Sequence, residues 1–216
     1  MLQRHEMKTM NKTLLLLALS FFVRTAIAGA EPVRDPIQAA VQTYFDQAFE
    51  RLRLVAEKKP TVASLRQDMK PLAEVTKGLF GGTLIDANFV ISQVYYPRDF
   101  LARGYDLKKV PQLTDFWKKM RAAPAPQLSE PGHRNLFQPR LIAMRYPVLV
   151  DGKLQSIVSA MIRTEAFLEE TGLAKAQGYR IICNGVQAES EGDLSGALTS
   201  FVLDLPATQW RIEYKK

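Results

Sequence analysis

Residues 141–162 of the 216-residue chain read LIAMRYPVLVDGKLQSIVSAMI and carry the clearest structural signal in the sequence. Two apolar runs, rich in strand-forming residues, are joined through Asp151-Gly152. An Asp-Gly pair between two such runs is the strongest short-range signal for a β-hairpin, because both residues accept the positive φ angles of a tight turn. The stretch therefore predicts a central antiparallel hairpin with strands at 141–150 and 154–162.

The register of this hairpin determines which side chains share a face of the sheet. In a two-residue loop, Val150 pairs with Lys153, and residues that lie directly opposite each other share a face. Counting back from that pair, one face carries Ile142, Met144, Tyr146, Ile157, Ser159 and Met161. The other face carries Ala143, Arg145, Val158, Ala160 and Ile162. A three-residue loop would change this assignment.

Upstream of the hairpin the sequence predicts two helices and a shorter hairpin. Asp35 and Pro36 suit the cap and the first position of a helix, and apolar residues then recur with helical spacing to about Lys58. A second helix at 62–77 contains Pro71, a residue that kinks or splits helices. Further strands are predicted at 82–87 and 89–96.

The remainder of the chain adds short elements around one long segment. Residues 97–138 are rich in proline, glycine and charge, with one short helix predicted at 114–121. A segment of this length inside a compact domain is usually functional. A helix ended by Gly172 is predicted at 165–171, and strands are predicted at 179–183 and 209–214.

The N-terminus has the three parts of a cleavable secretory signal peptide, predicted to span residues 1–30. Basic residues come first, an apolar run follows at 13–23, and the segment ends in small residues, so cleavage is expected after Ala28 or Ala30. The apolar run is much shorter than the ~20 residues of a membrane-spanning helix, which makes a retained anchor the minority interpretation. Residues 31–216 are expected to be a single domain, periplasmic or secreted, with no membrane span after cleavage.

The charge of the chain argues against a nucleic-acid partner, and its single cysteine argues against thiol chemistry. The formal net charge is +7, and residues 1–30 hold four basic residues and one acidic residue, so the remainder carries about +4. No basic run of the kind that follows phosphates is present, so nucleic acid is not an expected partner. Cys183 is the only cysteine and sits in an apolar run, which favours a core thiol over a reactive or lipid-bearing one.

No catalytic or cofactor motif stands out. Beyond residue 30, His133 is the only histidine, which leaves a metal site or a catalytic triad without partners. The serine of GDLSG at 192–196 lacks the spacing of a nucleophile elbow, so a turn is expected there. No glycine-rich phosphate loop or paired-cysteine motif is present. Neither catalysis nor a cofactor or metal is therefore expected.

Several strings resemble the extracytoplasmic PAS-like sensor modules called Cache or PDC domains, in a single-domain, soluble form. They are GTLIDANFVISQVYY at 82–96, GYDL at 104–107, Pro111, LSEP at 128–131, and YPV and DGKL within 146–154. The resemblance covers roughly residues 35–214. It implies an α+β fold with a PAS-like five-stranded antiparallel sheet, a long N-terminal helix on one face, and a ligand held between the other face and the 97–140 loop.

The chain departs from the amino-acid-binding members of that family at two places. Those members hold the ligand's amino group with an aspartate late in the central hairpin, where Met161 stands here. They hold the carboxylate with an arginine ahead of an aromatic pair in the loop, whereas the matching stretch here, VPQL at 110–113, has none. The resemblance therefore argues against an α-amino acid ligand.

Four candidate ligand-binding residues come from the central hairpin. By analogy with the family, the face that carries Met144, Tyr146, Ser159 and Met161 turns toward the ligand. Ordinary packing in a sheet that is buried on both sides is the competing interpretation.

The other candidates come from the loop and its borders. Trp117 offers an apolar wall with a polar edge, a combination found in binding pockets. Three arginines can each bind a carboxylate at two points, or lie solvated at the surface: Arg98, Arg121 and Arg140. Tyr96 ends the strand that leads into the loop, and it and Tyr95 cannot both face inward.

Together these features predict an exported small-molecule-binding protein of sensor type that performs no catalysis. The expected ligand is a small organic molecule, for which an anion is one candidate. A sensor domain without an output module needs a protein to report to, so a membrane receptor is a candidate partner and a homodimer a candidate assembly. The alternatives are a ligand-free structural or interaction protein of the same fold and an exported enzyme with an unrecognised site.

Overall fold

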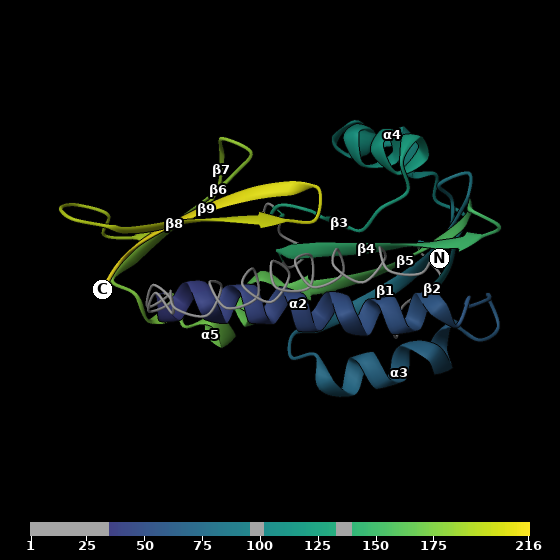
Figure 1. Ribbon diagram of the computed structural model, residues 1–216, viewed down its shortest axis with the longest axis horizontal. Coiled ribbons are helices and arrows are strands. Elements are labelled where there is room, and N and C mark those ends of the chain that lie inside the picture. Colours follow the sequence, from purple (N-terminus) through teal and green to yellow (C-terminus); the bar gives the residue numbers. More distant parts are fainter. Residues whose placement is uncertain (1–34, 96–101, 133–139) are drawn as a thin grey trace, which may run out of the picture. The chain divides into compact units, whose positions relative to one another are not determined.

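The computed structural model describes residues 35–95, 102–132 and 140–216, of which 36–216 form one compact unit. Its fold is α+β, as predicted, with two antiparallel sheets and several helices (Figure 1). The predicted signal peptide at 1–30 lies outside the described residues, and so do two of the candidate site residues, Tyr96 and Arg98.

The helices follow the predicted order. They are α2 (Pro36–Glu57), α3 (Leu65–Val75), α4 (Thr114–Ala122) and α5 (Thr164–Thr171), with 3-10 turns η2 (Leu107–Lys109), η3 (Pro111–Leu113) and η4 (Leu173–Lys175). Pro71 lies inside α3 without splitting it. Gly172 ends α5 with a φ of 81°, which glycine adopts without a steric penalty.

The first sheet has five antiparallel strands in the order β2-β1-β5-β4-β3. They are β1 (Leu79–Asp86), β2 (Ile91–Tyr95), β3 (Gln127–Leu128), β4 (Leu141–Val150) and β5 (Lys153–Arg163). Four of them form the two predicted hairpins. The sequence did not reveal β3, because two residues are too few to carry a periodic pattern.

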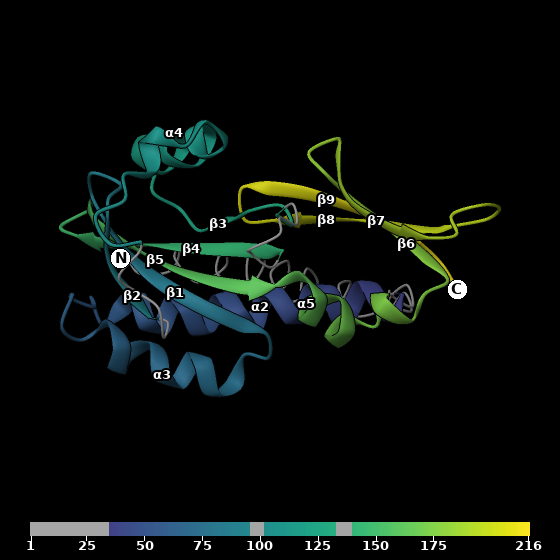
Figure 2. The same ribbon diagram turned by 180° about the vertical axis from the view of Figure 1, so that it is seen from behind.

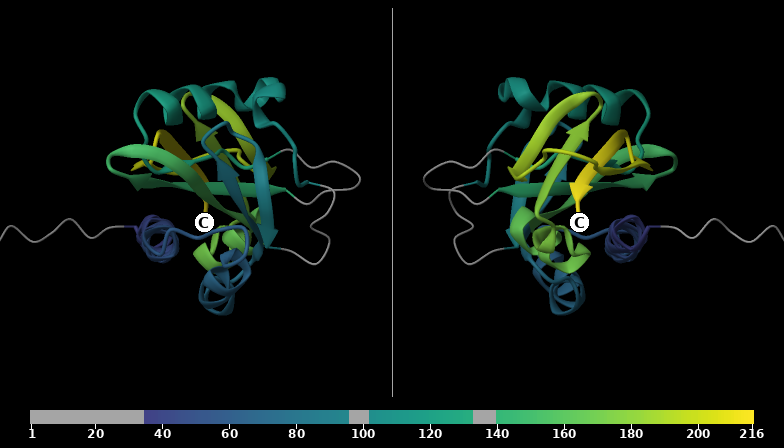
Figure 3. Two further views of the ribbon diagram at one scale, coloured as in Figure 1. Left: turned by 90° about the vertical axis from the view of Figure 1, so that its right-hand side faces the viewer. Right: turned by 90° about the vertical axis from the view of Figure 1, so that its left-hand side faces the viewer.

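Helices cover both faces of this sheet. α2 lies along one face, in contact with β4 and β5, and α3 lies beside it against β1 and β2. α4 lies over the opposite face, where Phe116 and Met120 pack against Ile85 and Ile157 of the sheet (Figure 3). The prediction of a long N-terminal helix on one face is therefore confirmed.

A second sheet of four strands, in the order β7-β6-β9-β8, lies over α2 and α5 (Figure 2). Its strands are β6 (Gly178–Cys183), β7 (Val186–Gly192), β8 (Thr199–Leu205) and β9 (Thr208–Lys215). Strands were predicted at 179–183 and 209–214, but β7 and β8 were missed. β7 reads VQAESEG and has no buried residue, so it lacks the apolar alternation that identifies a strand.

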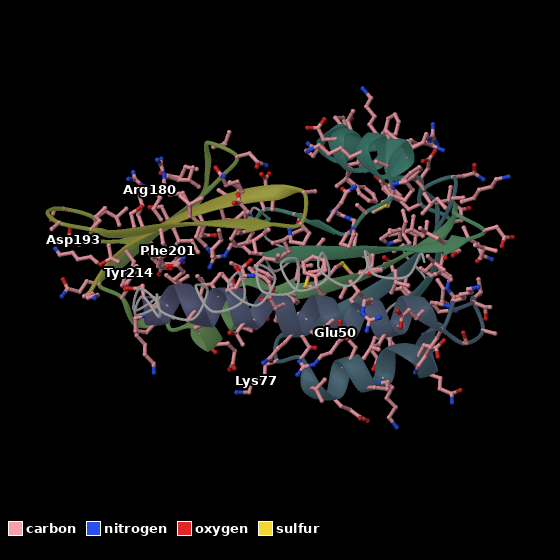
Figure 4. All side chains as sticks on the ribbon, in the orientation of Figure 1. Glu50, Lys77, Arg180, Asp193, Phe201 and Tyr214 are labelled. Carbon is pink, nitrogen blue, oxygen red and sulfur yellow. The ribbon has the colours of Figure 1, made fainter. Side chains whose placement is uncertain are left out.

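The second sheet is held by its inner face. Phe201 and Tyr214 point toward α2, whereas Arg180 lies on the outer face, where its Nε donates a 2.8 Å hydrogen bond to Glu213 (Figure 4). Trp210 of β9 is fully buried, with its ring 5.3 Å from that of Phe45 in α2. Edge-to-face ring contacts of this kind add to the apolar burial that fixes the sheet on the helix.

The central hairpin has the predicted turn and a different register. Asp151 and Gly152 have φ angles of 49° and 74°, and Val150 pairs with Lys153, as a two-residue turn requires. A β-bulge then shifts the pairing by one residue, so that Val148 lies opposite Ser156.

This bulge overturns the predicted faces. Side chains alternate along a strand, so a shift of one residue exchanges the faces of one strand relative to the other. Met144 and Tyr146 lie on the α2 face, whereas Ser159 and Met161 lie on the α4 face together with Arg145. The prediction that Met144, Tyr146, Ser159 and Met161 share a face, with Arg145 on the other, is wrong.

The environment of Cys183 predicts an inert thiol. The residue is 1 % exposed, and burial, assisted by the charge of Glu130, raises the thiol pKa to about 12. Because the thiolate is the reactive form, we expect Ellman's reagent at pH 8 to leave the folded protein unlabelled and to label one thiol per chain in denaturant. Rapid labelling of the folded protein, followed at 412 nm, would contradict this burial.

Candidate ligand-binding site

One row of residues crosses all five strands of the first sheet on the face that α4 covers. From edge to edge, the row is Gln127, Arg145, Ser159, Thr83 and Val94, each paired directly with the next. Directly opposed residues point to the same side of a sheet, so these side chains form a line, here called the polar row. All five residues are buried, and four of them are polar.

α4 encloses the polar row with apolar side chains. Phe116 and Met120, one helical turn apart, belong to an apolar cluster with Phe89 and with Ile157 of β5. The side-chain amide of Gln127 lies 3.5 Å from the backbone carbonyl of Phe116, to which it donates a long hydrogen bond. The polar row therefore lies under an apolar cover to which it is tied at one end.

Arg145 is the most unusual member of the row. It is 8 % exposed, and its guanidinium lies 4.1 Å from the centre of the Phe116 ring. Burial lowers the pKa of Arg145 to about 10, and no carboxylate among the described residues acts on it. A group with that pKa remains charged at neutral pH, so the site holds a buried positive charge without a described counter-ion.

Without a counter-ion, the burial of Arg145 costs more free energy of folding than its ring contact returns. A cation over an aromatic ring gains about 2 kcal/mol when desolvated. Taking an ion out of water costs several kcal/mol even after relaxation. The ring contact with Phe116 therefore offsets only part of the desolvation of Arg145, and no described carboxylate supplies the remainder.

Trp117 supplies a second polar group without a partner. Its indole Nε1 is buried and has no hydrogen-bond acceptor among the described residues. The Arg121 guanidinium, which is exposed, lies 5.4 Å from the Trp117 ring and 5.3 Å from the ring of Phe89. The predicted residues Trp117 and Arg121 thus lie together on α4, at the border of the apolar cluster above the sheet.

Arg140 has a structural setting instead. Its guanidinium bonds Glu165 of α5 at 3.1 Å and Glu189 of β7, which connects the start of β4 with the second sheet. Burial would lower the pKa of Arg140, but the hydrogen bond to Glu165 and the charges of both glutamates outweigh it and raise the pKa. Its donors are thus engaged by two carboxylates of the chain itself.

The sequence-based set and the structure overlap in part. Ser159 and Met161 lie on the α4 face, with Ser159 directly opposite Arg145, while Met144 and Tyr146 belong to the core beneath α2. Arg145 was missed because the predicted register assigned it to the wrong face. The available signal was an arginine in the middle of the apolar run LIAMRYPVLV, since arginine is rarely buried without a reason.

Neither a metal site nor a membrane-spanning helix is found in the described parts of the chain. Among residues 35–95, 102–132 and 140–216, no three histidine, cysteine, aspartate or glutamate side chains lie close enough together to hold a metal ion. Over the same ranges, no helix combines the length and the apolar character needed to cross a membrane.

The unpaired charge makes a prediction about stability. Replacing Arg145 by Met (Arg145→Met) keeps much of the volume and removes the buried charge, so we expect the free energy of unfolding to rise by about 1–3 kcal/mol. Urea denaturation of protein refolded from denaturant, and so free of bound molecules, measures the change. Arg163→Met is the matched control, because Arg163 also lies over a ring, that of Phe80 at 4.9 Å, but is exposed. A variant at Arg145 less stable than wild type would contradict the assignment.

The paired arginine predicts the opposite sign. Arg140→Met leaves the largely buried Glu189 without its partner, so we expect the free energy of unfolding to fall by about 2–4 kcal/mol. Arg53→Met, which removes exposed ion pairs with Glu50 and Glu57 within α2, serves as control and should cause no measurable loss. Equal losses in the two variants would show that the Arg140 cluster is not a buried structural contact.

Comparison with known proteins finds solved structures with a similar fold. No protein-family model and no curated protein sequence matches the chain. Among solved structures, the ligand-binding domain of the Pseudomonas aeruginosa amino-acid chemoreceptor PctC, in complex with GABA, is similar with a TM-score of 0.59 at 14 % identity, over 82 % of this chain and 93 % of that one. The ligand-binding domain of the Pseudomonas fluorescens chemoreceptor CtaA, in complex with L-alanine, gives 0.57 at 14 % identity, over 82 % and 91 %.

A further neighbour is longer than this chain. An extracellular ligand-binding receptor from Desulfohalobium retbaense is similar with a TM-score of 0.62 at 14 % identity over 83 % of this chain, which spans 39 % of the receptor's length. At such identities the likeness is one of fold. The chain thus has the α+β fold of chemoreceptor ligand-binding domains.

Proposed function

We propose that this chain is an extracytoplasmic sensor-type domain of the Cache/PDC kind, which binds a small organic molecule between the polar row and α4 without chemical conversion. The observation that carries the proposal is Arg145, a buried and charged side chain with no counter-ion among the described residues. Energetically costly and perturbed ionisable groups cluster at functional sites, and a ligand anion would supply the interaction that offsets the burial of Arg145.

Two further features support this place for the ligand. The indole N–H of Trp117 is a buried donor without an acceptor, on the helix that covers the row. The neighbours in fold are receptor domains solved with small molecules, GABA in PctC and L-alanine in CtaA. A pocket with apolar walls and a few placed polar groups is the ordinary form of such a site.

The rest of the proposal concerns the setting of the domain. With a cleaved N-terminal signal, the domain would act in the periplasm or outside the cell, and a membrane receptor would carry its signal inward. Binding would stabilise the closed arrangement of α4 over the sheet, and a homodimer is the candidate assembly. None of these steps requires a bond to be made or broken.

A thermal-shift screen of the full chain tests the proposal. A ligand that binds only the folded state at 100 times its Kd adds about 2.7 kcal/mol, which raises the melting temperature by about 5–10 °C in a protein of this size. We expect at least one compound from a library of organic acids, amines and amino acids to do so. Arg180→Met, on the outer face of the second sheet, should respond as wild type does.

The screen also has an outcome that rejects the proposal. If no library compound shifts the transition of protein refolded from denaturant, and native mass spectrometry of the protein as purified finds no bound small molecule, the domain is not a small-molecule sensor of this type.

A further inference from the structure

We infer that the ligand is a carboxylate with an apolar body and without an ammonium group. This inference rests on the proposed function and assigns the chemical class of the molecule at the same site. It comes from the kinds of hydrogen-bonding groups that the α4 face of the first sheet offers, and from the charge that this face lacks.

The α4 face carries a positive charge and no negative one among its described sheet positions. One row along from the polar row, Gly81, Met161 and Ala143 lie side by side, and on the other side lie Ile85, Ile157 and Pro147. None of these residues, nor any in the polar row itself, is acidic. A ligand ammonium placed there would meet Arg145 and no carboxylate from these described sheet positions.

Electrostatics then separates anions from zwitterions. An ammonium that leaves water for a buried site without an anion pays for its own desolvation, and the like charge of Arg145 adds repulsion. A carboxylate at the same place gains a charge-assisted contact with Arg145, and the guanidinium in turn gains a counter-ion that no described residue supplies.

The geometry of Arg145 suits a carboxylate in particular. The guanidinium carbon of Arg145 lies over the Phe116 ring, 4.1 Å from its centre. The five N–H donors of arginine lie in the guanidinium plane, and a contact with the ring face uses none of them, so they are available for a two-point contact with a planar carboxylate. Ser159, directly opposite Arg145 on β5, adds a hydroxyl that is able to donate to the same anion.

The remaining polar group also favours acceptors. The indole N–H of Trp117 donates hydrogen bonds and does not accept them. Because it has no acceptor among the described residues, an oxygen or another acceptor on the ligand would satisfy it. The side chains around these donors are apolar and buried, among them Phe89, Met120 and Ile157. A carboxylate on a hydrocarbon or aromatic body matches both properties.

This class differs from the molecules seen in the neighbours of the fold. GABA in PctC and L-alanine in CtaA each carry an ammonium as well as a carboxylate. The site proposed here would reject that second charge. Its specificity would therefore be for the acid and against the corresponding amino acid.

Matched sets of ligands test the inference on the full chain. The sets are butyrate, GABA and butylamine; propionate and L-alanine; and 3-phenylpropionate and L-phenylalanine. Within at least one set, we expect the acid to bind tenfold or more tightly than its amino counterpart by calorimetry, and the amine alone not to bind. Arg145→Met should weaken binding of that acid by about 10- to 100-fold, the effect of losing a charged hydrogen-bond pair.

Two variants separate loss of charge from loss of fold. Arg145→Lys keeps the charge without the planar fork and should restore part of the affinity, whereas a purely structural defect at this position would not respond to charge. Arg180→Met, whose side chain lies on the outer face of the second sheet, should bind the acid as wild type does. Circular dichroism confirms that each variant is folded.

The possible results have distinct meanings. If an amino acid binds as tightly as its acid, or if Arg145→Met binds the acid undiminished, the assigned ligand class is overturned while the sensor function stands. If a compound that is neither an acid nor an amino acid is the only ligand in the wider library, the class is overturned in the same way. If nothing binds, the proposed function itself fails.

Discussion

A one-residue bulge in the central hairpin is the constraint on which the candidate site depends. Because of it, β4 and β5 pair as Arg145 with Ser159 rather than as Met144 with Ser159. Every pairing between the bulge and the far end of the hairpin inherits this shift, since side-chain direction alternates residue by residue. The polar row exists only in this register. In the unshifted one, Arg145 and Ser159 would point to opposite faces.

The candidate site also depends on the presence of two separate apolar clusters, one on each face of the first sheet. One lies beneath the sheet and joins α2 and α5 to the second sheet, with Phe45, Phe167 and Trp210 in mutual ring contact. The other lies above the sheet under α4 and is smaller. The larger cluster supplies most of the burial that stabilises the fold. The fold therefore remains stable although the smaller cluster encloses Arg145, a group that does not stabilise it.

Two arginines, half-buried Arg140 just before β4 and buried Arg145 within it, show how context separates structure from function. Arg140 meets Glu165 and Glu189, so its charge is balanced within the chain and links the start of β4 to α5 and β7. Arg145, five residues later, meets an aromatic ring and no described carboxylate. The residue type is the same in both cases. Only the partners brought by distant segments differ.

The sequence by itself determined the features that depend on neighbouring residues: the Asp151-Gly152 turn, the start of α2 at Pro36 and the end of α5 at Gly172. It also indicated Trp117, Arg121, Ser159 and Met161, which the structure brings to the α4 side. Only the tertiary structure decided the bulged register, the second sheet and the partners of each arginine. Periodicity reveals that a strand has two faces but not how it is aligned with its neighbour, and Glu189 reaches Arg140 across 49 positions of sequence. Such contacts are set by the packing of the whole domain, so the local sequence pattern does not predict them.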